Sequence, residues 1–350
     1  MNSVRNGNPR WTQFRNKAVG ISARVIGEYF IKSADLGRFL TLTRIAPRLT
    51  NSKVSVSALI DDRNACGEAP LWDATQQKLY WTDCAGKFYS YDWKTRRKRI
   101  VLESFEVTGC AFDQSGGFTF VNNSGVWSWN KTDKPVLVVS EFGAEKLQLN
   151  DCIADPEGRL LSGSCFYNPV EPYRLGKLFC VETNGAVRIL DEGFHLANGL
   201  GFSVDGRTLY FTDSVARSIY AYSYDSMTGR VRDRRLFVKV DSDAGIPDGL
   251  TVDAEGFVWS AEWYGSCLAR YDPAGKLERR IQIPAKQTSS LAFGGPGLLD
   301  IFVTSAAKSE PTPVMPPGYD PNTGYFGGAL FHFNAGVQGR IEYRTRIETR

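Results

Sequence analysis

Histidines, paired cysteines and long apolar runs are scarce or absent in this chain of 350 residues. The two histidines, His195 and His332, are too few for a three-histidine zinc site, and they form no HExxH protease motif. No stretch approaches the roughly 18 consecutive apolar residues of a membrane-spanning helix, so no membrane span is expected. A Gly-x-Ser-x-Gly motif is also missing, which argues against an α/β serine hydrolase.

The seven cysteines are scattered along the chain and never form a CxxC motif. Their odd number and irregular spacing favour reduced thiols in the core of a cytosolic protein over a disulfide framework. One disulfide stays open as an alternative, because spacing alone does not pair cysteines. The sequence therefore predicts a cytoplasmic protein.

Charge is distributed unevenly between the two ends of the chain. Residues 1–50 carry nine Lys or Arg against two acidic residues, and the total of +4 then leaves residues 51–350 at −3. A mildly acidic body lacks the basic surface of nucleic-acid-binding proteins, so no nucleic-acid partner is expected. We predict that residues 1–50 form a basic N-terminal extension, partly helical or disordered, with an organelle presequence as the alternative.

The body of the chain contains a repeat. Six units each have a short apolar strand, a turn and a second strand, and a third or fourth strand often follows. The turn positions lie 40, 42, 50, 48 and 41 residues apart, at Asp73, Asp113, Asp155, Asp205, Asp253 and Gly294. Three or four strands in every unit of this length predict an all-β protein, a six-bladed β-propeller over residues 51–350. A pair of β-sandwiches is the alternative, and the steady period argues against it.

A propeller must close its ring, and strands from both ends of the chain often pair to do so. We expect Val54–Ser57 or the adjacent residues 58–60 to supply the N-terminal part of this closure. We expect Ile341–Arg344 to supply the C-terminal part.

Four polar residues occupy the same phase of the repeat in four different units. They precede or open the apolar first strands, at Glu68, Asn150, Asn198 and Asp248. Equivalent positions of a ring converge on its axis, so two carboxylates and two amides are expected to meet there. Such oxygen donors suit Ca²⁺, Mg²⁺ or Mn²⁺, or with fewer ligands Zn²⁺ or Fe²⁺. Asn-Gly and Asp-Gly are also common turn dipeptides, but four such residues in register favour one divalent metal site.

The motifs around these residues resemble those of the senescence marker protein/gluconolactonase family, which includes regucalcin and the luciferin-regenerating enzymes. The matching segments are Gly67-Glu-Ala-Pro-Leu-Trp-Asp73, Leu149-Asn-Asp151, Ala197-Asn-Gly-Leu200 and Ile246-Pro-Asp-Gly-Leu250, within a resemblance from about residue 55 to 346. The resemblance implies a six-bladed propeller with one axial metal ion and a lactone-opening activity. It also implies that Glu68, Asn198 and Asp248 bind the metal and that Asn150 lies beside the substrate.

One position departs from the family pattern. Many members carry Arg two residues before the substrate-side Asn, whereas this chain has Gln148. The missing guanidinium removes a charged substrate contact, and Arg174 is a candidate replacement. Together with aromatic residues in two predicted loops, Gln148 predicts a lactone that is neutral and less hydroxylated, or that carries an apolar substituent.

The predicted chemistry is attack of a metal-activated water on the carbonyl of a small-molecule lactone or ester. Asp248 is both a metal ligand and a candidate general base. A phosphotriester or other ester hydrolase on the same scaffold stays open, because a fold does not determine function. A non-enzymatic interaction propeller is the other alternative, although its Tyr-Trp-Thr-Asp motif occurs in full only once, at Tyr80–Asp83. The repeat itself specifies no oligomeric state.

Overall fold

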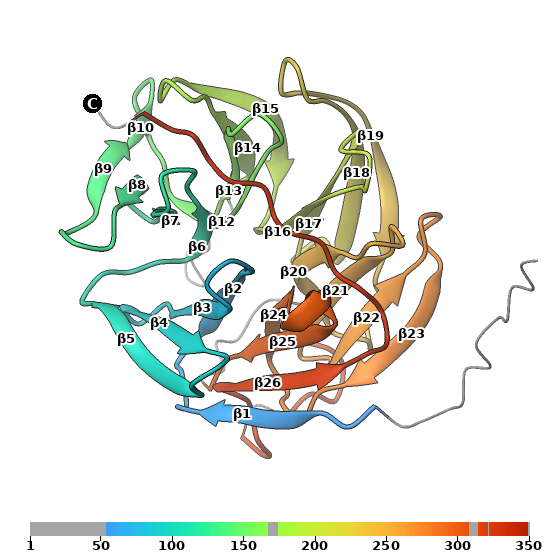
Figure 1. The fold of residues 1–350 in the computed structure, drawn as a ribbon. Helices are drawn as coiled ribbons and strands as arrows, with labels where there is room; N and C mark the ends of the chain where they lie inside the picture. Colours follow the sequence, from blue (N-terminus) through green and yellow to red (C-terminus); the bar gives the residue numbers. More distant parts are fainter. Residues whose placement is uncertain (1–53, 167–173, 308–313, 321, 349–350) are drawn as a thin grey trace, which may run out of the picture. The chain divides into compact units, whose positions relative to one another are not determined.

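The computed structural model describes residues 54–166, 174–307, 314–320 and 322–348. These residues form six four-stranded antiparallel sheets, arranged as blades around a common axis (Figure 1). The predicted six-bladed β-propeller is thereby confirmed. The predicted extension, residues 1–50, lies outside the described residues. Within the described part, no helix has the length and apolarity needed to cross a membrane.

The blades follow the order of the sequence repeat, from the innermost strand outward. Blade one contains β2 (Gly67–Asp73), β3 (Lys78–Asp83), β4 (Lys87–Asp92) and β5 (Arg97–Glu103). Blade two contains β6 (Gly109–Phe112), β7 (Phe118–Asn122), β8 (Gly125–Trp129) and β9 (Val136–Val139). Blade three contains β12 (Leu149–Ala154), β13 (Leu160–Ser164), β14 (Gly176–Val181) and β15 (Val187–Phe194). Blade four contains β16 (Ala197–Phe202), β17 (Thr208–Asp213), β18 (Ser218–Asp225) and β19 (Arg230–Lys239). Blade five contains β20 (Ile246–Val252), β21 (Val258–Trp263), β22 (Cys267–Tyr271) and β23 (Leu277–Gln282). Blade six contains β24 (Thr288–Gly294), β25 (Asp300–Ser305), β26 (Ala329–Asn334) and β1 (Ser57–Asp61). A short hairpin of β10 (Glu141–Phe142) and β11 (Glu145–Lys146) precedes blade three, and a 3-10 turn, η1 (Pro296–Leu298), lies in blade six.

Strand β1 closes the ring. It pairs antiparallel with β26, with Ser57 opposite His332, and so becomes the outer strand of blade six. The expected N-terminal contribution to closure is therefore confirmed. The expected C-terminal contribution from Ile341–Arg344 is wrong, because these residues form no strand. The edge of β26 that they would have needed is already occupied by β1.

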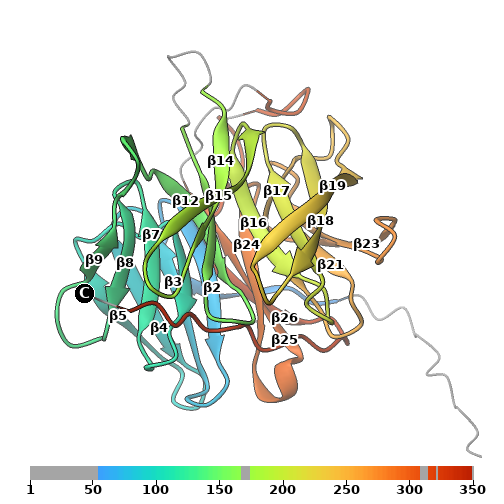
Figure 2. The ribbon, with the colours of Figure 1, turned by 90° about the horizontal axis from the view of Figure 1, so that it is seen from above.

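Residues 335–348 instead run across several blades, and we call them the C-terminal strap (Figures 1 and 2). Their backbone N–H groups donate to carbonyls at the ends of the first strands of three blades or in the turns that follow. The bonds are Gly339 to Leu298 O at 2.8 Å, Thr345 to Phe112 O at 2.8 Å and Arg346 to Gly158 O at 2.7 Å. The strap therefore lies at the ends of the first strands, opposite the positions where those strands begin.

The hydrophobic core is divided among the six interfaces between neighbouring blades. Six clusters of buried side chains each combine residues of two adjacent blades. Trp72 of blade one, for example, stacks on Phe302 of blade six with ring centroids 5.6 Å apart. Because a single blade cannot bury its own faces, the ring is stable only when every blade has both neighbours.

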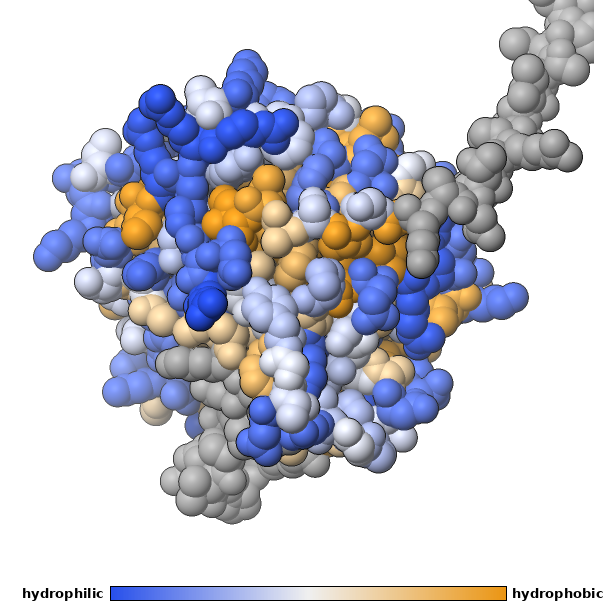
Figure 3. Space-filling view, turned by 90° about the horizontal axis from the view of Figure 1, so that it is seen from below, coloured by the Kyte–Doolittle hydropathy of each residue, from blue (hydrophilic) through white to orange (hydrophobic). Residues whose placement is uncertain are grey.

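Three of the outer strands expose mainly charged side chains. Strands β5, β19 and β23 have the sequences RKRIVLE, RVRDRRLFVK and LERRIQ, with most of their charged residues at the surface. On the side of the molecule drawn in Figure 3, hydrophobic patches are separated by hydrophilic residues. Charged side chains on outer strands oppose edge-to-edge pairing with other chains.

Deleting residues 1–50 should leave the propeller folded. Val54 and Val56 pack on the cluster between blades five and six, and β1 begins at Ser57, so this truncation removes none of these contacts. We expect the melting temperature, followed by circular dichroism, to change by less than about 2 °C. A second truncation that ends at residue 61 removes β1 and should lower the melting temperature strongly. An insoluble protein after the shorter deletion contradicts the prediction.

Candidate metal centre

Each of the four predicted site residues lies at a β-bulge near the start of a first strand. The strand register is interrupted between Glu68 and Leu71 in blade one. The same interruption occurs at Leu149/Cys152, Ala197/Leu200 and Pro247/Leu250. A bulge bends its strand and re-aims a side chain, and bulges are frequent beside active sites. The common phase of these residues in the sequence therefore corresponds to a common backbone irregularity.

The two amides are held in one hydrogen-bonded chain that runs from blade three to blade five. Asn150 Nδ2 donates to Asn198 Oδ1 at 2.7 Å and to Ala197 O at 2.9 Å. Asn198 Nδ2 donates to Ser214 Oγ at 2.8 Å, and Ser214 Oγ donates to Pro247 O at 2.6 Å. Because both amide nitrogens act as donors, the amide oxygens are the atoms available to a cation.

Glu68 and Asp248 bring two negative charges into a poorly solvated region. Burial raises the pKa of Glu68 well above its usual range, and the charge of Asp248 raises it further. Burial also raises the pKa of Asp248, which is 5% exposed, with smaller contributions from Asp151 and Glu262. A hydrogen bond with Asn198 partly offsets this shift. Within the described residues, neither Glu68 nor Asp248 forms an ion pair with Lys, Arg or His.

These donors fit a divalent cation. Like charges buried without a counter-ion are costly, and a bound cation removes that cost. In the part of the chain that the structure describes, no three His, Cys, Asp or Glu side chains gather in a metal-binding group. A cation here would therefore be held by the carboxylates of Glu68 and Asp248 and by the amide oxygen of Asn198, with Asn150 alongside. Oxygen donors of this kind favour Ca²⁺, Mg²⁺ or Mn²⁺.

Sequence reasoning missed Ser214, which is buried and connects Asn198 to blade five. Replacing Ser214 with Ala removes the acceptor that fixes the Asn198 amide. We expect the affinity of the metal-free protein for a divalent ion to fall about tenfold, as measured by calorimetric titration. Ser218→Ala is the matched control, since Ser218 is another buried serine but donates to Ala216 O instead. Equal affinities in both variants contradict a positioning role for Ser214.

Gln148 and Arg174 lie together in a groove of about 630 Å³, lined also by Phe142, Ala144, Glu145 and Lys146. The Arg174 side chain is 58% exposed, and its Nη2 donates to Glu145 Oε1 at 2.6 Å. Its guanidinium also lies over the Phe166 ring, 4.2 Å from the centroid. The structure thus brings the two predicted substrate residues into one groove, although Arg174 already has a carboxylate partner.

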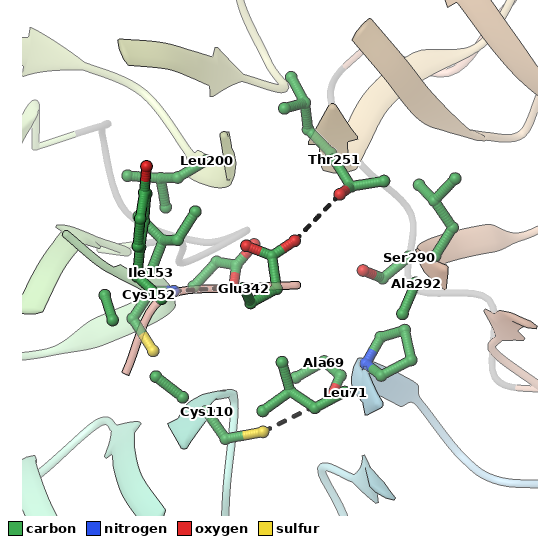
Figure 4. Close-up of a pocket in the computed structure, with 17 residues that line it drawn as sticks. Ala69, Leu71, Cys110, Cys152, Ile153, Leu200, Thr251, Ser290, Ala292 and Glu342 are labelled. Atoms are coloured by element: carbon green, nitrogen blue, oxygen red, sulfur yellow. Dashed lines mark hydrogen bonds between the residues drawn. The ribbon is translucent and has the colours of Figure 1, made fainter. Parts of the chain in front are cut away.

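A cavity of about 60 Å³ lies along the axis between the bulges and the strap (Figure 4). Glu342 of the strap reaches into it, and Thr251 Oγ1 donates to Glu342 Oε1 at 3.1 Å. Burial raises the pKa of Glu342 and raises that of Asp151, which also lines the cavity, to about 6. Sequence reasoning identified neither carboxyl group.

Comparison with known proteins agrees with this architecture. The family model described as SMP-30/Gluconolactonase/LRE-like region matches residues 66–307. The chain is 33% identical to the pentonolactonase XacC of Haloferax volcanii over 84% of this chain and 99% of that protein. It is 31% identical to the regucalcin of Xenopus laevis over 73% of this chain and 88% of that protein. A solved luciferin-regenerating enzyme superposes with a TM-score of 0.74 at 25% identity, over 84% of this chain and 100% of that one. The resemblance noted in the sequence is thus confirmed, and the chain belongs to the SMP-30/gluconolactonase/LRE-like family.

Proposed function

We propose that this chain is a divalent-metal-dependent hydrolase that opens lactones. The single observation behind this proposal is the carboxylate pair of Glu68, which is half-buried, and Asp248, which is buried. Both lack a cationic partner among the described residues and lie beside oriented amides. A relative named pentonolactonase, 33% identical over nearly its whole length, supports the substrate class.

A divalent ion bound here would supply Lewis acidity, polarising an ester carbonyl and making a water more acidic. The chain supplies the remaining functions. Asp248 would accept the proton of the attacking water, because a bound cation would keep its carboxylate ionised beside that water. Ser214 Oγ accepts from Asn198 Nδ2 and so holds the amide oxygen of Asn198 in place as a ligand. Asn150 lies on the substrate side, fixed by its bonds to blade four, and orients the lactone ring.

The groove of Gln148 and Arg174 would hold the substituents of the lactone. Gln148 offers a neutral amide, and the Arg174 guanidinium is occupied by Glu145, so neither presents an unpaired positive charge. We therefore propose a lactone that is neutral and bears few hydroxyl groups, or carries an apolar substituent.

Gln148→Arg tests this specificity. The new guanidinium would donate to several hydroxyls at once, so we expect kcat/KM for a polyhydroxylated sugar lactone to rise about tenfold relative to an apolar γ-lactone. Arg174→Ala is the control and should not change the ratio in that direction. An unchanged ratio in the Gln148→Arg variant contradicts the proposed preference for less hydroxylated lactones. The same holds if gluconolactone is already the best substrate of the unmodified protein.

The decisive experiment for the proposed function is a substrate panel with the metal-loaded protein. Acid release would be followed with sugar lactones, apolar lactones and a phosphotriester at the same enzyme concentration. We expect the best lactone to exceed the phosphotriester by at least about a hundredfold in kcat/KM, since the site would be complementary to the carbonyl reaction. A phosphotriester that is hydrolysed faster than every lactone overturns the proposal, as does a panel without any turnover.

A further inference from the structure

Two cysteines stand directly opposite each other beside the candidate metal centre. Gly67 pairs with Asp83 at the end of the β2–β3 ladder, and Cys84 N donates to Cys66 O at 2.9 Å one residue further. The Asp83 carboxylate holds this segment in place by accepting from Cys66 N at 3.1 Å. Both cysteines are free thiols and only partly buried, and the ladder sets their side chains opposite each other. Opposed residues in such a ladder have Cα atoms about 5.5 Å apart, which lies within the range that a disulfide spans, about 4.4–6.8 Å.

We propose that Cys66 and Cys84 form a reversible disulfide when the protein meets a peroxide, and that this bond alters the position of Glu68. Cys66 and Cys84 differ from the other nearby cysteines because they are partly exposed to solvent. Cys110 and Cys152 are buried in the axial cavity, and Cys110 Sγ donates to a backbone carbonyl there. Partial exposure and direct opposition therefore single out Cys66 and Cys84 within the described residues.

The chemistry balances with hydrogen peroxide as the oxidant. One thiolate attacks a peroxide oxygen, the O–O bond breaks, and the departing hydroxide takes up a proton to leave as water. The resulting sulfenic acid is attacked by the second thiol, so that the S–S bond forms, the S–O bond breaks and a second water leaves. Two thiols lose two electrons in total, and one peroxide becomes two waters. A dithiol such as dithiothreitol reverses the bond by thiol–disulfide exchange.

The packing around Gly67 explains how the bond reaches the site. Two separate thiols must bring their sulfurs to about 2.05 Å when they bond, which pulls the Cys66 and Cys84 side chains toward each other. Gly67 cannot absorb the shift: a Cβ there would lie 2.9 Å from Ser305 O, and Ser289 Oγ donates to Gly67 O at 2.6 Å. The next residue is Glu68, and displacements near 1 Å in such a site reduce function strongly. The effect on Glu68 rests on the proposed metal centre, whereas formation of the disulfide does not.

The test uses the full-length protein treated with hydrogen peroxide, which is then removed with catalase. Peptide mapping by mass spectrometry should find Cys66 linked to Cys84 with the loss of two hydrogens, and dithiothreitol should restore both thiols. Calorimetric titration of the metal-free oxidised protein with Ca²⁺ and Mn²⁺ should show at least a tenfold loss of affinity. Cys84→Ser is the control, because it keeps Cys66 beside Glu68 but cannot form the bond.

The possible outcomes test formation of the disulfide and its effect on Glu68 separately. Absence of the 66–84 linkage, or a Cys110–Cys152 linkage in its place, overturns the proposed redox pair. A mapped disulfide without any change in metal affinity overturns the effect on Glu68. An equal loss of affinity in peroxide-treated Cys84→Ser also overturns that effect. Since the linkage is read by mass, it is established or refuted even if the protein hydrolyses no lactone.

Discussion

Removing divalent ions from the purified protein should abolish lactone hydrolysis, to below about 1% of the starting rate, and adding a divalent ion should restore it. Without a cation, Glu68 and Asp248 repel each other, and burial favours their protonated forms. A protonated Asp248 can no longer accept a proton from water, and no charge remains to polarise the lactone carbonyl. The measurement is the initial rate after exhaustive chelation and after titration with Ca²⁺, Mn²⁺, Mg²⁺ and Zn²⁺.

The control for metal removal is the fold. The ring is held by six clusters between blades and by β1, none of which includes Glu68 or Asp248. The far-ultraviolet circular dichroism spectrum should therefore be unchanged in the metal-free protein, and the loss of rate should be fully reversible. Full activity in a sample shown to be metal-free would rule out the proposed mechanism.

Asp248→Ala should lower kcat/KM by about 10²–10⁴-fold, because it removes one ligand and the proposed general base together. Asp248→Asn separates these roles. It keeps an oxygen donor on the same bulge, so we expect it to retain more metal affinity than the Ala variant while losing a similar share of the rate. Rates on the preferred lactone at saturating metal provide the comparison.

Asp205→Ala is the matched control for Asp248. Asp205 is exposed in the turn after β16, at the end of that strand opposite Asn198. Its loss should change the rate by less than about twofold, as for most surface substitutions. The assignment of Asp248 is wrong if its Ala variant keeps more than about a tenth of the activity at saturating metal.

Local sequence signals predicted most of the fold. The alternation of short apolar strands with Asp-containing turns is a local property, and the turns formed as expected. Asp113 Oδ1 accepts the N–H of Ser115, and Asp253 Oδ1 accepts that of Glu255, so each Asp stabilises the turn that it begins. Ring closure was only half predictable. Strand pairing at β26 depends on which distant segment packs at that edge, and apolar pattern alone does not distinguish 57–61 from 341–344.

The candidate site was also only partly predictable from the sequence. The phase of Glu68, Asn150, Asn198 and Asp248 in the repeat was visible in the sequence, because a periodic chain places equivalent residues at equivalent depths. The bulges that aim these residues were not visible, since a bulge is defined by the register of a neighbouring strand. Ser214 and Glu342 were missed for a related reason, because each acts between blades. The opposed thiols of Cys66 and Cys84 were missed because they depend on the register of β2 against β3.

By itself, the sequence determined the number of blades and the positions of four oxygen-bearing residues at one phase of the repeat. These follow from short apolar strands and Asp-containing turns that recur about every 44 residues, which local chain geometry converts directly into structure. Only the tertiary structure decided which strand closes the ring and that the strap crosses one end of the blades. It also decided which hydrogen bonds orient the amides and which two thiols stand opposite each other. Those features depend on contacts between distant segments, whose partners are selected by the packing of the whole ring rather than by any local signal.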